Sequence, residues 1–302
     1  MPVLCLFLLL CGLPLLMGKA IAQPSGPLCA HDSNAKAICL AQPAQRVISL
    51  SPGGTEQLYA AGAGHQVIAT VDYSDYPSEA ARLPRVGSSS QLDVERIAAL
   101  NPDLVVAWTS GNAPAQLHQL EALGITVIRL DPQRIDDVAT TLVTLGRLTG
   151  HQHEAEQASH EFLQGMAALR TRFAGKSRVR TFYEVWNQPL MTINRHQLIS
   201  QVISLCGGTN IYGELPALVP HVSTEAVLVA NPDIIVSGGP GQYDSRWLAT
   251  WRKWPELNAV RYQALYFIPP DLIQQPTPRL LQGAQRLCQY IDKTRQQMIR
   301  AS

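Results

Sequence analysis

A thirteen-residue stretch of this chain is written twice, and that repeat limits the possible folds more than any other feature. The stretch "VERIAALNPDLVV" begins at Val94, and "TEAVLVANPDIIV" begins at Thr224. Aligning Glu95 with Glu225 superimposes twelve positions at a constant offset of 130 residues, with Asn-Pro-Asp at the same place in both copies. A chain that repeats itself in this way predicts two similar structural units.

Each copy predicts a short helix that ends before a buried strand. Asp93 and Ser223 stand directly before the copies and are favourable N-cap residues. Apolar residues recur at helical spacing in both copies, at Ile97, Leu100, Val227 and Ala230. Asn-Pro-Asp then breaks the helix, because proline cannot continue it, and an apolar strand follows.

The rest of the chain also alternates strands with helices. "RVISLSP" (46–52) predicts a strand and "TEQLYAAG" the helix after it, while "GITVIRLDP" and "ALYFIPPD" predict further strands. Such alternation implies parallel sheets covered by helices on both faces. At a typical domain size of roughly 150 residues, 302 residues favour two units. The predicted fold class is α/β, with two lobes of parallel sheets flanked by helices.

One long helix is predicted between the lobes. Its apolar residues recur every three or four positions from about 152 to 174, at Ala155, Ala158, Phe162, Met166, Leu169 and Phe173. We expect an N-terminal lobe over 23–132, a linking helix region over 133–174 and a C-terminal lobe over 175–302. A stiff link leaves a cleft between the lobes, where the strand ends of open α/β sheets bind ligands.

The composition is that of a globular protein without a strong electric field. Apolar residues make up 46% of the chain and charged residues 16%, which excludes a disordered chain. Twenty-four basic residues face twenty-three acidic ones, and no run of like charges occurs. Nothing in this balance attracts nucleic acid or an anionic membrane.

The N-terminus has the pattern of a secretory signal peptide. An apolar run from Val3 to Met17 precedes Ala20-Ile21-Ala22, a small-x-small cleavage pattern, so we expect residues 1–22 to be removed before Gln23. The run is too short for a stable membrane span. Lipidation at Cys11 is the alternative processing. Export would place the mature protein outside the cytoplasm.

The cysteines that remain after cleavage predict two disulfides. Cys29, Cys39, Cys206 and Cys288 form an even set in an exported protein, with three possible connectivities. We expect Cys29–Cys39 to close a hairpin-like stretch and Cys206–Cys288 to tie the final helix to the second lobe. Four buried free thiols are the alternative.

No motif points to catalysis or to a bound metal. A phosphate-binding G-x-x-x-x-G-K-[ST] loop and a G-x-S-x-G nucleophile turn are both absent. His153, Glu156 and His160 share one helical face, but no further ligand lies nearby in sequence, so we interpret them as a solvated first turn. We therefore expect a protein that is not an enzyme and has no catalytic or metal site.

Aromatic residues fall into two groups. Trp247, Trp251 and Trp254 are spaced at i, i+4 and i+7, which is typical of a helix face buried in the core. Tyr73, Trp108 and Trp186 instead stand beside turn residues just past predicted strands. At the open edge of a sheet, such a ring can offer its face to a ligand.

These features resemble the helical-backbone (class III) solute-binding proteins of ABC importers, which deliver siderophores, haem and cobalamin. The resemblance covers about residues 46–290 and rests on "RVISLSPGGTE", "DYSDYP", "LDVERIAALNPDLVVAWTSGN", "LCGGTNIY", "VSTEAVLVANPDIIVSGGP" and "PTPRLLQGAQRLC". Within that superfamily, "YSDYP" together with "AW" and "GN" is most similar to the vitamin B12-binding branch. The resemblance implies a monomeric periplasmic protein that captures cobalamin or a related corrinoid as cargo, without a cofactor.

The resemblance also implies roles for single residues. Tyr73 and Trp108 are expected to contact the corrin ring, Pro52 and Gly53 to bring the backbone close to it, and Asp271 to contact its polar fringe. Two positions depart from the branch. Where the best-known relative carries tryptophan before the first repeat, this chain has Ser89, and a second-lobe tryptophan of that relative falls near Val219. From the other wall, Trp186 and Tyr183 are candidates to compensate.

The repeated glutamates and two further polar residues are the remaining candidates for a functional role. By the resemblance, Glu95 and Glu225 dock onto arginines of the two transmembrane subunits of the importer; both also favour the N-terminal end of their helices. A ferric siderophore or haem is the alternative cargo, because Arg195 could meet the negative charge of a siderophore and His196 could ligate haem iron. A metal-dependent or hydrolytic periplasmic enzyme is the alternative from another functional class.

Overall fold

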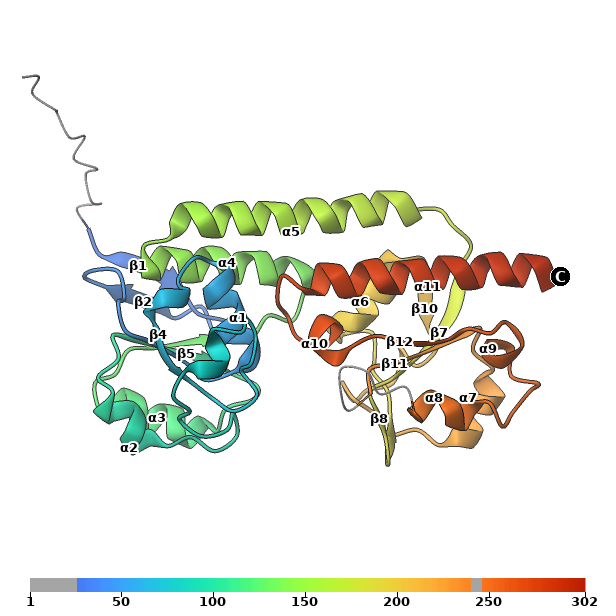
Figure 1. The fold of residues 1–302 in the computed structure, drawn as a ribbon, viewed down its shortest axis with the longest axis horizontal. Helices are drawn as coiled ribbons and strands as arrows, with labels where there is room; N and C mark the ends of the chain where they lie inside the picture. The colour runs from blue at the N-terminus through green and yellow to red at the C-terminus, as the bar shows by residue number, and fades with distance from the viewer. Residues whose placement is uncertain (1–25, 240–245, 302) are drawn as a thin grey trace, which may run out of the picture.

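The computed structural model describes residues 26–239 and 246–301, so the expected signal peptide (1–22) lies outside the described residues. Two four-stranded sheets, with all described strand pairs in them parallel, lie at the two ends of the long axis (Figure 1). The first has the strand order β4-β3-β5-β6, and the second β10-β7-β11-β12. The predicted α/β class with two lobes is confirmed.

The N-terminal lobe and the helix after it contain β1 (Leu28–His31), β2 (Ala37–Leu40), β3 (Val47–Ser49), α1 (Pro52–Ala60), β4 (Val67–Thr70), α2 (Val94–Ala99), β5 (Leu104–Trp108), α3 (Pro114–Ala122), β6 (Val127–Leu130) and α4 (Ile135–Thr149), with short 3-10 helices at Gly64–Gln66 and Ala80–Arg82. The long helix α5 (Gln152–Phe173) follows. The C-terminal lobe contains β7 (Val179–Glu184), β8 (Trp186–Asn187), β9 (Leu190–Met191), α6 (Leu198–Leu205), β10 (Gly208–Asn210), α7 (Thr224–Ala230), β11 (Ile234–Ser237), α8 (Arg246–Trp251), α9 (Asn258–Arg261), β12 (Leu265–Phe267), α10 (Pro270–Ile273) and α11 (Leu280–Ala301).

The repeat forms the same unit in each lobe. The two copies become α2 with β5 and α7 with β11, and each strand lies third in the order of its sheet. The side chains of Asp93 and Ser223 cap their helices by accepting from the backbone N–H three residues on. Asn101 and Asn231 both adopt left-handed backbone (φ 50° and 43°), which asparagine tolerates and which turns the chain from helix to strand.

The aspartate of each Asn-Pro-Asp joins the repeat to its sheet. Asp103 accepts from the backbone N–H of Arg46, and Asp233 from that of Arg180. Arg46 stands directly before β3, and Arg180 lies at the start of β7. Their guanidinium groups donate to carbonyls at the ends of α2 and α7, respectively. One arrangement of helix end, aspartate and arginine therefore positions a strand in both lobes.

Helix α5 runs along the long axis of the molecule and packs on both lobes (Figure 1). At about 1.5 Å per residue, its length is about 33 Å. Ala155 near its start belongs to an apolar core of the first lobe, whereas Phe162 and Met166 belong to the core of the second. The predicted helical face is thus divided between two cores, and the helix cannot bend freely between them.

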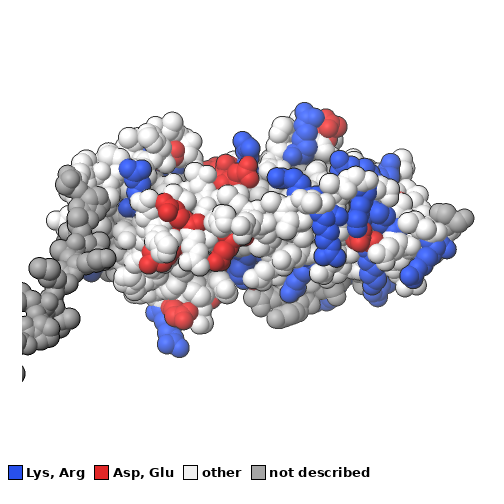
Figure 2. Space-filling view, turned by 90° about the horizontal axis from the view of Figure 1, so that it is seen from above, with Lys and Arg blue, Asp and Glu red and all other residues white. Residues whose placement is uncertain are grey.

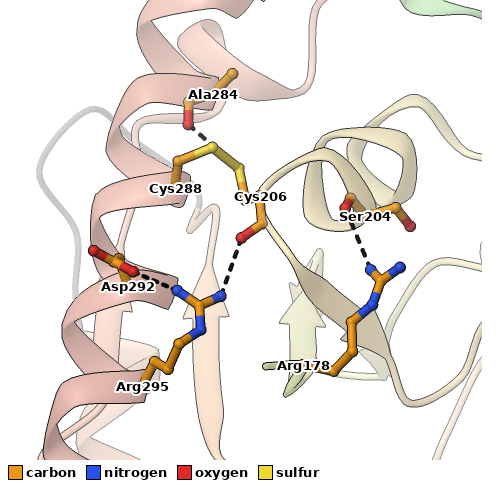
Figure 3. The surroundings of a disulfide bond; sticks show 7 residues. All are labelled: Arg178, Ser204, Cys206, Ala284, Cys288, Asp292 and Arg295. Atoms are coloured by element: carbon orange, nitrogen blue, oxygen red, sulfur yellow. Dashed lines mark hydrogen bonds and ion pairs between the residues drawn. A yellow bond between two sulfur atoms is a disulfide. The ribbon is translucent and has the colours of Figure 1, made fainter. Parts of the chain in front are cut away.

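Both expected cysteine pairs are disulfides in the structure. Cys29 and Cys39 face each other across the β1–β2 hairpin. Cys206, at the end of α6, is bonded to Cys288 in α11 (Figure 3). Beside this second bond, Arg295 of α11 donates to the carbonyl of Cys206 and pairs with Asp292. The last helix is therefore fixed to the second lobe by covalent and polar contacts.

Two details of the predicted helices are wrong. Helix α1 begins at Pro52 instead of Thr55, because Ser51 caps it and proline is favourable in the first turn. The tryptophan stripe is interrupted, since α8 ends at Trp251. Trp251 is buried and Trp254 packs beside it, but Trp247 is only partly buried and does not belong to that core.

The neutral overall charge hides a separation along the long axis. Residues 23–174 carry ten Lys and Arg against fifteen Asp and Glu, a net charge of −5, and residues 175–302 carry thirteen against eight, a net charge of +5. Seen from the side of the long helices, Lys and Arg gather over the C-terminal lobe (Figure 2). Within the described part of the chain, no helix has the length and apolar character needed to cross a membrane.

Candidate functional site

A cavity of about 260 Å³ lies where the first lobe meets the segment 274–276 of the second. Three of the expected site residues line it together, namely Pro52, Gly53 and Trp108. Gln274, Gln275 and Pro276 close it from the C-terminal lobe, and the remaining lining residues are Ser51, Gly54, Gln57, Val106, Ala107, Leu130, Pro132 and Thr141. The carboxyl ends of β5 and β6 and the start of α1 thus meet at one opening between the lobes.

The start of α1 brings backbone to this cavity. Ser51 caps the helix by accepting from the N–H of Gly54 at 3.0 Å. A side chain at Gly54 would lie only 2.9 Å from the Ser51 hydroxyl, so this cap requires glycine. A Cβ at Gly53 would stand 3.6 Å from Thr277 of the other lobe, which shows how closely the lobes approach at this point.

Trp108, the last residue of β5, is held in place while its ring stays accessible. Its indole N–H donates to Asp131 at 3.1 Å, and its backbone N–H donates to the side chain of Asn112 at 2.7 Å. A Cβ at Gly111 would lie 1.9 Å from the indole, so the ring covers that glycine closely. The side chain remains 39% exposed. Its orientation is therefore fixed before any ligand arrives.

Tyr73 projects from a turn after β4 and does not line the cavity. It is 84% exposed and has a left-handed backbone (φ 64°). The turn is stabilised by Arg85, whose guanidinium donates to the carbonyls of Val71 and Ser74 and to the carboxylate of Asp75. An exposed ring on a braced turn is available for contact with a large ligand.

Asp271 is engaged by an arginine. Its Oδ2 accepts from Arg279 at 2.8 Å, and the same guanidinium donates twice to Glu56 of α1, at 2.7 and 2.9 Å. Arg279 also lies over the ring of Tyr76 at 3.7 Å from its centre. Burial by itself lowers the pKa of Arg279, but the hydrogen bonds and charges of the two carboxylates outweigh it and leave the pKa raised.

The two aromatic residues expected on the second wall differ in accessibility. Tyr183 is fully buried, with its hydroxyl accepting from Gln274 at 3.3 Å, so it cannot offer a ring face to a ligand and the suggested compensation by it is wrong. Trp186 is 46% exposed on the β8–β9 hairpin and packs edge-on against Trp247, with ring centres 5.3 Å apart. It does not line the interlobe cavity.

The repeated glutamates lie away from the cavity. Glu95 in α2 and Glu225 in α7 are exposed, and neither forms an ion pair with another described residue. Both helices lie on the side of the molecule opposite α5, one on each lobe (Figure 1). A backbone N–H and the Ser223 hydroxyl lower the pKa of Glu225. Glu95 and Glu225 therefore occupy equivalent positions of the two repeats, on the side of the molecule opposite α5.

The residues considered for metal or for other cargo lie elsewhere. His153, Glu156 and His160 are exposed on α5, and no group of three potential metal ligands occurs in residues 26–239 and 246–301. Arg195 is paired with Glu214 at 2.6 Å. Neither Arg195 nor His196 lines the interlobe cavity.

The sequence patterns missed most of the lining. Gln57 lies inside an ordinary helix, and Gln274, Gln275 and Pro276 occupy a connection whose sequence shows only that it is polar. Only the run of Gln and Pro after the last predicted strand could have drawn attention to this connection. Ser89 is partly buried and its carbonyl accepts from Asn112, while Val219 is partly buried.

One buried carboxyl in the second lobe has an unusual environment. Glu184, at the end of β7, is fully buried and receives the indole N–H of Trp251 at 3.1 Å. Its other oxygen has no hydrogen-bond partner among the described residues. Burial raises the pKa of Glu184 to about 7, an effect that the Trp251 bond offsets only in part.

We expect the free energy of unfolding to fall as the pH rises from about 4.5 to 7. In that interval the folded protein keeps the Glu184 proton while the unfolded chain has lost it, because the folded pKa is about 7 and the ordinary value 4.5. Linkage makes the effect about 3 kcal/mol. Urea unfolding of the wild type and of Glu184→Gln between pH 4.5 and 8 measures it. An equally steep pH dependence in Glu184→Gln would rule out this residue as the cause.

Comparison with known proteins adds to this geometry. A family model described as periplasmic binding protein matches residues 47–272. The vitamin B12-binding protein of Yersinia pestis (strain Pestoides F) is 42% identical over 251 residues, which cover 83% of this chain and 88% of that protein. The vitamin B12-binding protein of Vibrio cholerae serotype O1 is 36% identical over 250 residues, covering 82% and 90%.

Solved structures show the same architecture. The crystal structure of the periplasmic vitamin B12-binding protein of Vibrio cholerae superimposes with a TM-score of 0.77 at 35% identity, covering 83% of this chain and 98% of that one. A periplasmic haem-binding protein from Pseudomonas aeruginosa matches in fold, with a TM-score of 0.74 at 22% identity over 82% and 92% of the two chains. Since the family match runs from β3 to α10 and so includes both sheets and the helix that joins them, the chain belongs to the periplasmic binding protein family.

Proposed function

We propose that this protein captures a corrinoid, cobalamin or a close relative, in the cleft between its lobes and delivers it to an ABC importer. The observation that carries the proposal is the 36–42% identity, over more than four-fifths of the chain, to proteins named for binding vitamin B12. Members of the family are solute-binding proteins, so this chain binds a solute and is not an enzyme. The corrinoid is cargo and not a cofactor.

The chemistry of the cleft supports this ligand class. A corrin is a broad ring edged with amides, and it needs flat apolar faces together with scattered donors and acceptors. Pro52, Trp108 and Pro276 offer apolar surface, while Gln274 and Gln275 offer amides. The cavity of 260 Å³ is smaller than the sites of about 300–1,000 Å³ that hold drug-sized ligands, so it receives only part of the corrinoid.

We assign the rest of the ligand to side chains outside the cavity. Tyr73 is the most accessible aromatic ring among the exposed large apolar residues of the first lobe. Trp186 is accessible on the second lobe, and the side chain of Asp271 is 22% exposed beside Arg279. In this proposal the two rings contact the ligand outside the cavity and Asp271 contacts its polar edge.

The family match supports a partner and a location. Periplasmic binding proteins act with importers, and we propose that Glu95 and Glu225 contact the transmembrane subunits, one from each lobe. Residues 1–22 would direct export and be removed. The lobes would span 23–132 and 175–302, with 133–174 as the link, and the protein would act as a monomer.

The test is retention of a coloured ligand. The mature, disulfide-intact protein is mixed with cyanocobalamin, cobinamide or haemin and desalted, and the visible spectrum is recorded. We expect corrinoid absorbance at about one ligand per protein. Retention of haemin alone would move the assignment to a haem carrier, and retention of none of the three would contradict the proposal.

Trp108→Ala should weaken corrinoid binding by about 1–3 kcal/mol, as truncation of an aromatic anchor commonly does. The ring is fixed by Asp131 and Asn112 at the mouth of the cavity, so its loss removes a flat surface that is already in position. Calorimetric titration with cyanocobalamin measures the change, and Trp254→Ala, in the distant core of the second lobe, is the control. An unchanged affinity in Trp108→Ala would exclude the ring from the site.

A further inference from the structure

The two lobes are joined by a small polar contact beside the interlobe cavity, which two of its residues, Gln57 and Pro276, also line. On the first lobe it contains Glu56 and Gln57 of α1, and on the second Pro276 and Arg279. The amide of Gln57 donates to the carbonyl of Pro276. Among the described residues, Glu56 with Arg279 is the only ion pair that joins residues 26–132 to residues 175–301.

Arg279 is held by three partners. Two of its nitrogens donate to Glu56 and a third to Asp271, and its guanidinium covers the ring of Tyr76. The side chain of Arg279 is 13% exposed and that of Glu56 only 4%. A planar guanidinium suits such a fork-like contact, which the point charge of lysine cannot reproduce.

Each partner of Arg279 belongs to an element with an expected ligand contact. Glu56 is in α1, whose first residues Pro52 and Gly53 line the cavity. Tyr76 lies three residues after Tyr73 in the same loop after β4. The third partner is Asp271 itself. Through one side chain, three separate parts of the ligand site are held in fixed positions relative to one another.

The contact depends on Arg279 because several polar atoms around the guanidinium lack hydrogen-bond partners. One oxygen each of Glu56, Gln57 and Asp271, and the hydroxyl of Thr277, are buried without a hydrogen-bond partner among the described residues. Without the guanidinium, the buried carboxylate of Glu56 and the partly exposed carboxylate of Asp271 would have no cation beside them. A buried, unpaired charge is costly, so the contact would separate and admit water.

We propose that Arg279 is a positioning residue of the ligand site, which sets the spacing of the two lobes and the placement of the Tyr73 turn before the ligand binds. This inference rests on the proposed corrinoid function. It assigns to Arg279 no contact with the ligand. Its role is to raise the fraction of molecules in which α1, the turn and Asp271 already stand in the arrangement that the ligand needs.

The expected effect follows from that fraction. If Arg279→Met leaves about one molecule in ten in the binding arrangement, the apparent Kd for cyanocobalamin rises about tenfold. Arg279→Lys keeps the charge but loses the fork, so its Kd should lie between those of the wild type and Arg279→Met. Arg286→Met removes an exposed arginine from α11 and should leave the Kd unchanged.

A distance measurement separates positioning from a general loss of structure. Spin labels at Gln119→Cys in α3 and Val229→Cys in α7, both exposed, report the interlobe distance by pulsed electron resonance. Without ligand, Arg279→Met should give a broader distribution than the wild type, and saturating cyanocobalamin should narrow it again. If Arg279→Met does not fold, the neutral variant Glu56→Gln/Asp271→Asn/Arg279→Met replaces it, because no buried charge is left unpaired in it.

The outcomes are distinct. A wild-type Kd together with a wild-type distribution in Arg279→Met, or in the neutral variant, would overturn the proposal. If the wild type itself retains no corrinoid, the proposed function fails, whereas the ligand-free distributions still decide whether Arg279 sets the lobe spacing. A broader distribution in the variant and an unchanged one in Arg286→Met would support it.

Discussion

Cells whose binding protein carries Glu95→Ala and Glu225→Ala together should lose high-affinity vitamin B12 uptake, while the purified variant binds cyanocobalamin as the wild type does. Both carboxylates are exposed, at the same place of the two repeats and away from the cavity. Each charge-assisted contact with an importer arginine would contribute about 1.5–3 kcal/mol. Losing two such contacts would weaken docking by at least a hundredfold.

The control removes the same charge from other surfaces. Glu161→Ala/Glu256→Ala takes two exposed carboxylates from α5 and from the C-terminal lobe and should leave uptake intact. Each single variant, Glu95→Ala or Glu225→Ala, should give an intermediate rate, since distant sites act additively. Uptake of labelled cyanocobalamin and calorimetric titration are measured in parallel. A fall in ligand affinity equal to the fall in uptake would refute the separation of docking from binding.

Removing the disulfide of the C-terminal lobe should have the largest effect on stability. Cys206 and Cys288 are 82 residues apart, and the loss of loop-closure entropy in the unfolded chain predicts about 4.5 kcal/mol from this bond. Cys29 and Cys39 are 10 residues apart, for which the same relation gives about 2.8 kcal/mol. Both Cys206 and Cys288 are fully buried, so Cys206→Ala/Cys288→Ala also loses packing.

Guanidinium unfolding of the two double-alanine variants measures the difference. We expect the Cys206/Cys288 variant to unfold at a clearly lower denaturant concentration than the Cys29/Cys39 variant. Equal losses from the two pairs would show that loop length does not govern their contributions.

The sequence predicted the architecture well because local signals agree with the global fold. N-caps at Asp93 and Ser223, the break at Asn-Pro-Asp and short apolar strands each depend on residues close in the chain. The helix Gln152–Phe173 was predicted for the same reason, since its apolar spacing is regular. Such features can be recognised without knowing what they pack against.

The prediction that Trp247, Trp251 and Trp254 form one buried helix face is wrong because helical spacing does not show where a helix ends. Helix α8 ends at Trp251, so Trp254 leaves the helix and Trp247 is free to meet Trp186. The interlobe contact was missed for a different reason. Glu56 and Arg279 are 223 positions apart, and no pattern within either segment indicates the other. Only the folded chain brings such groups together.

The position of helix α11 has a consequence for the order in which the protein folds. A chain that emerges from its N-terminus first can complete the cores of the first lobe once residue 158 is available, because their members end there. The core of the second lobe needs Leu280, Ala284, Leu287 and Ile291 of the last helix, and Cys206 has no partner until Cys288 arrives. The second lobe thus remains open until almost the whole chain has emerged. Its unpaired apolar surface makes this late interval the one most exposed to aggregation and proteolysis.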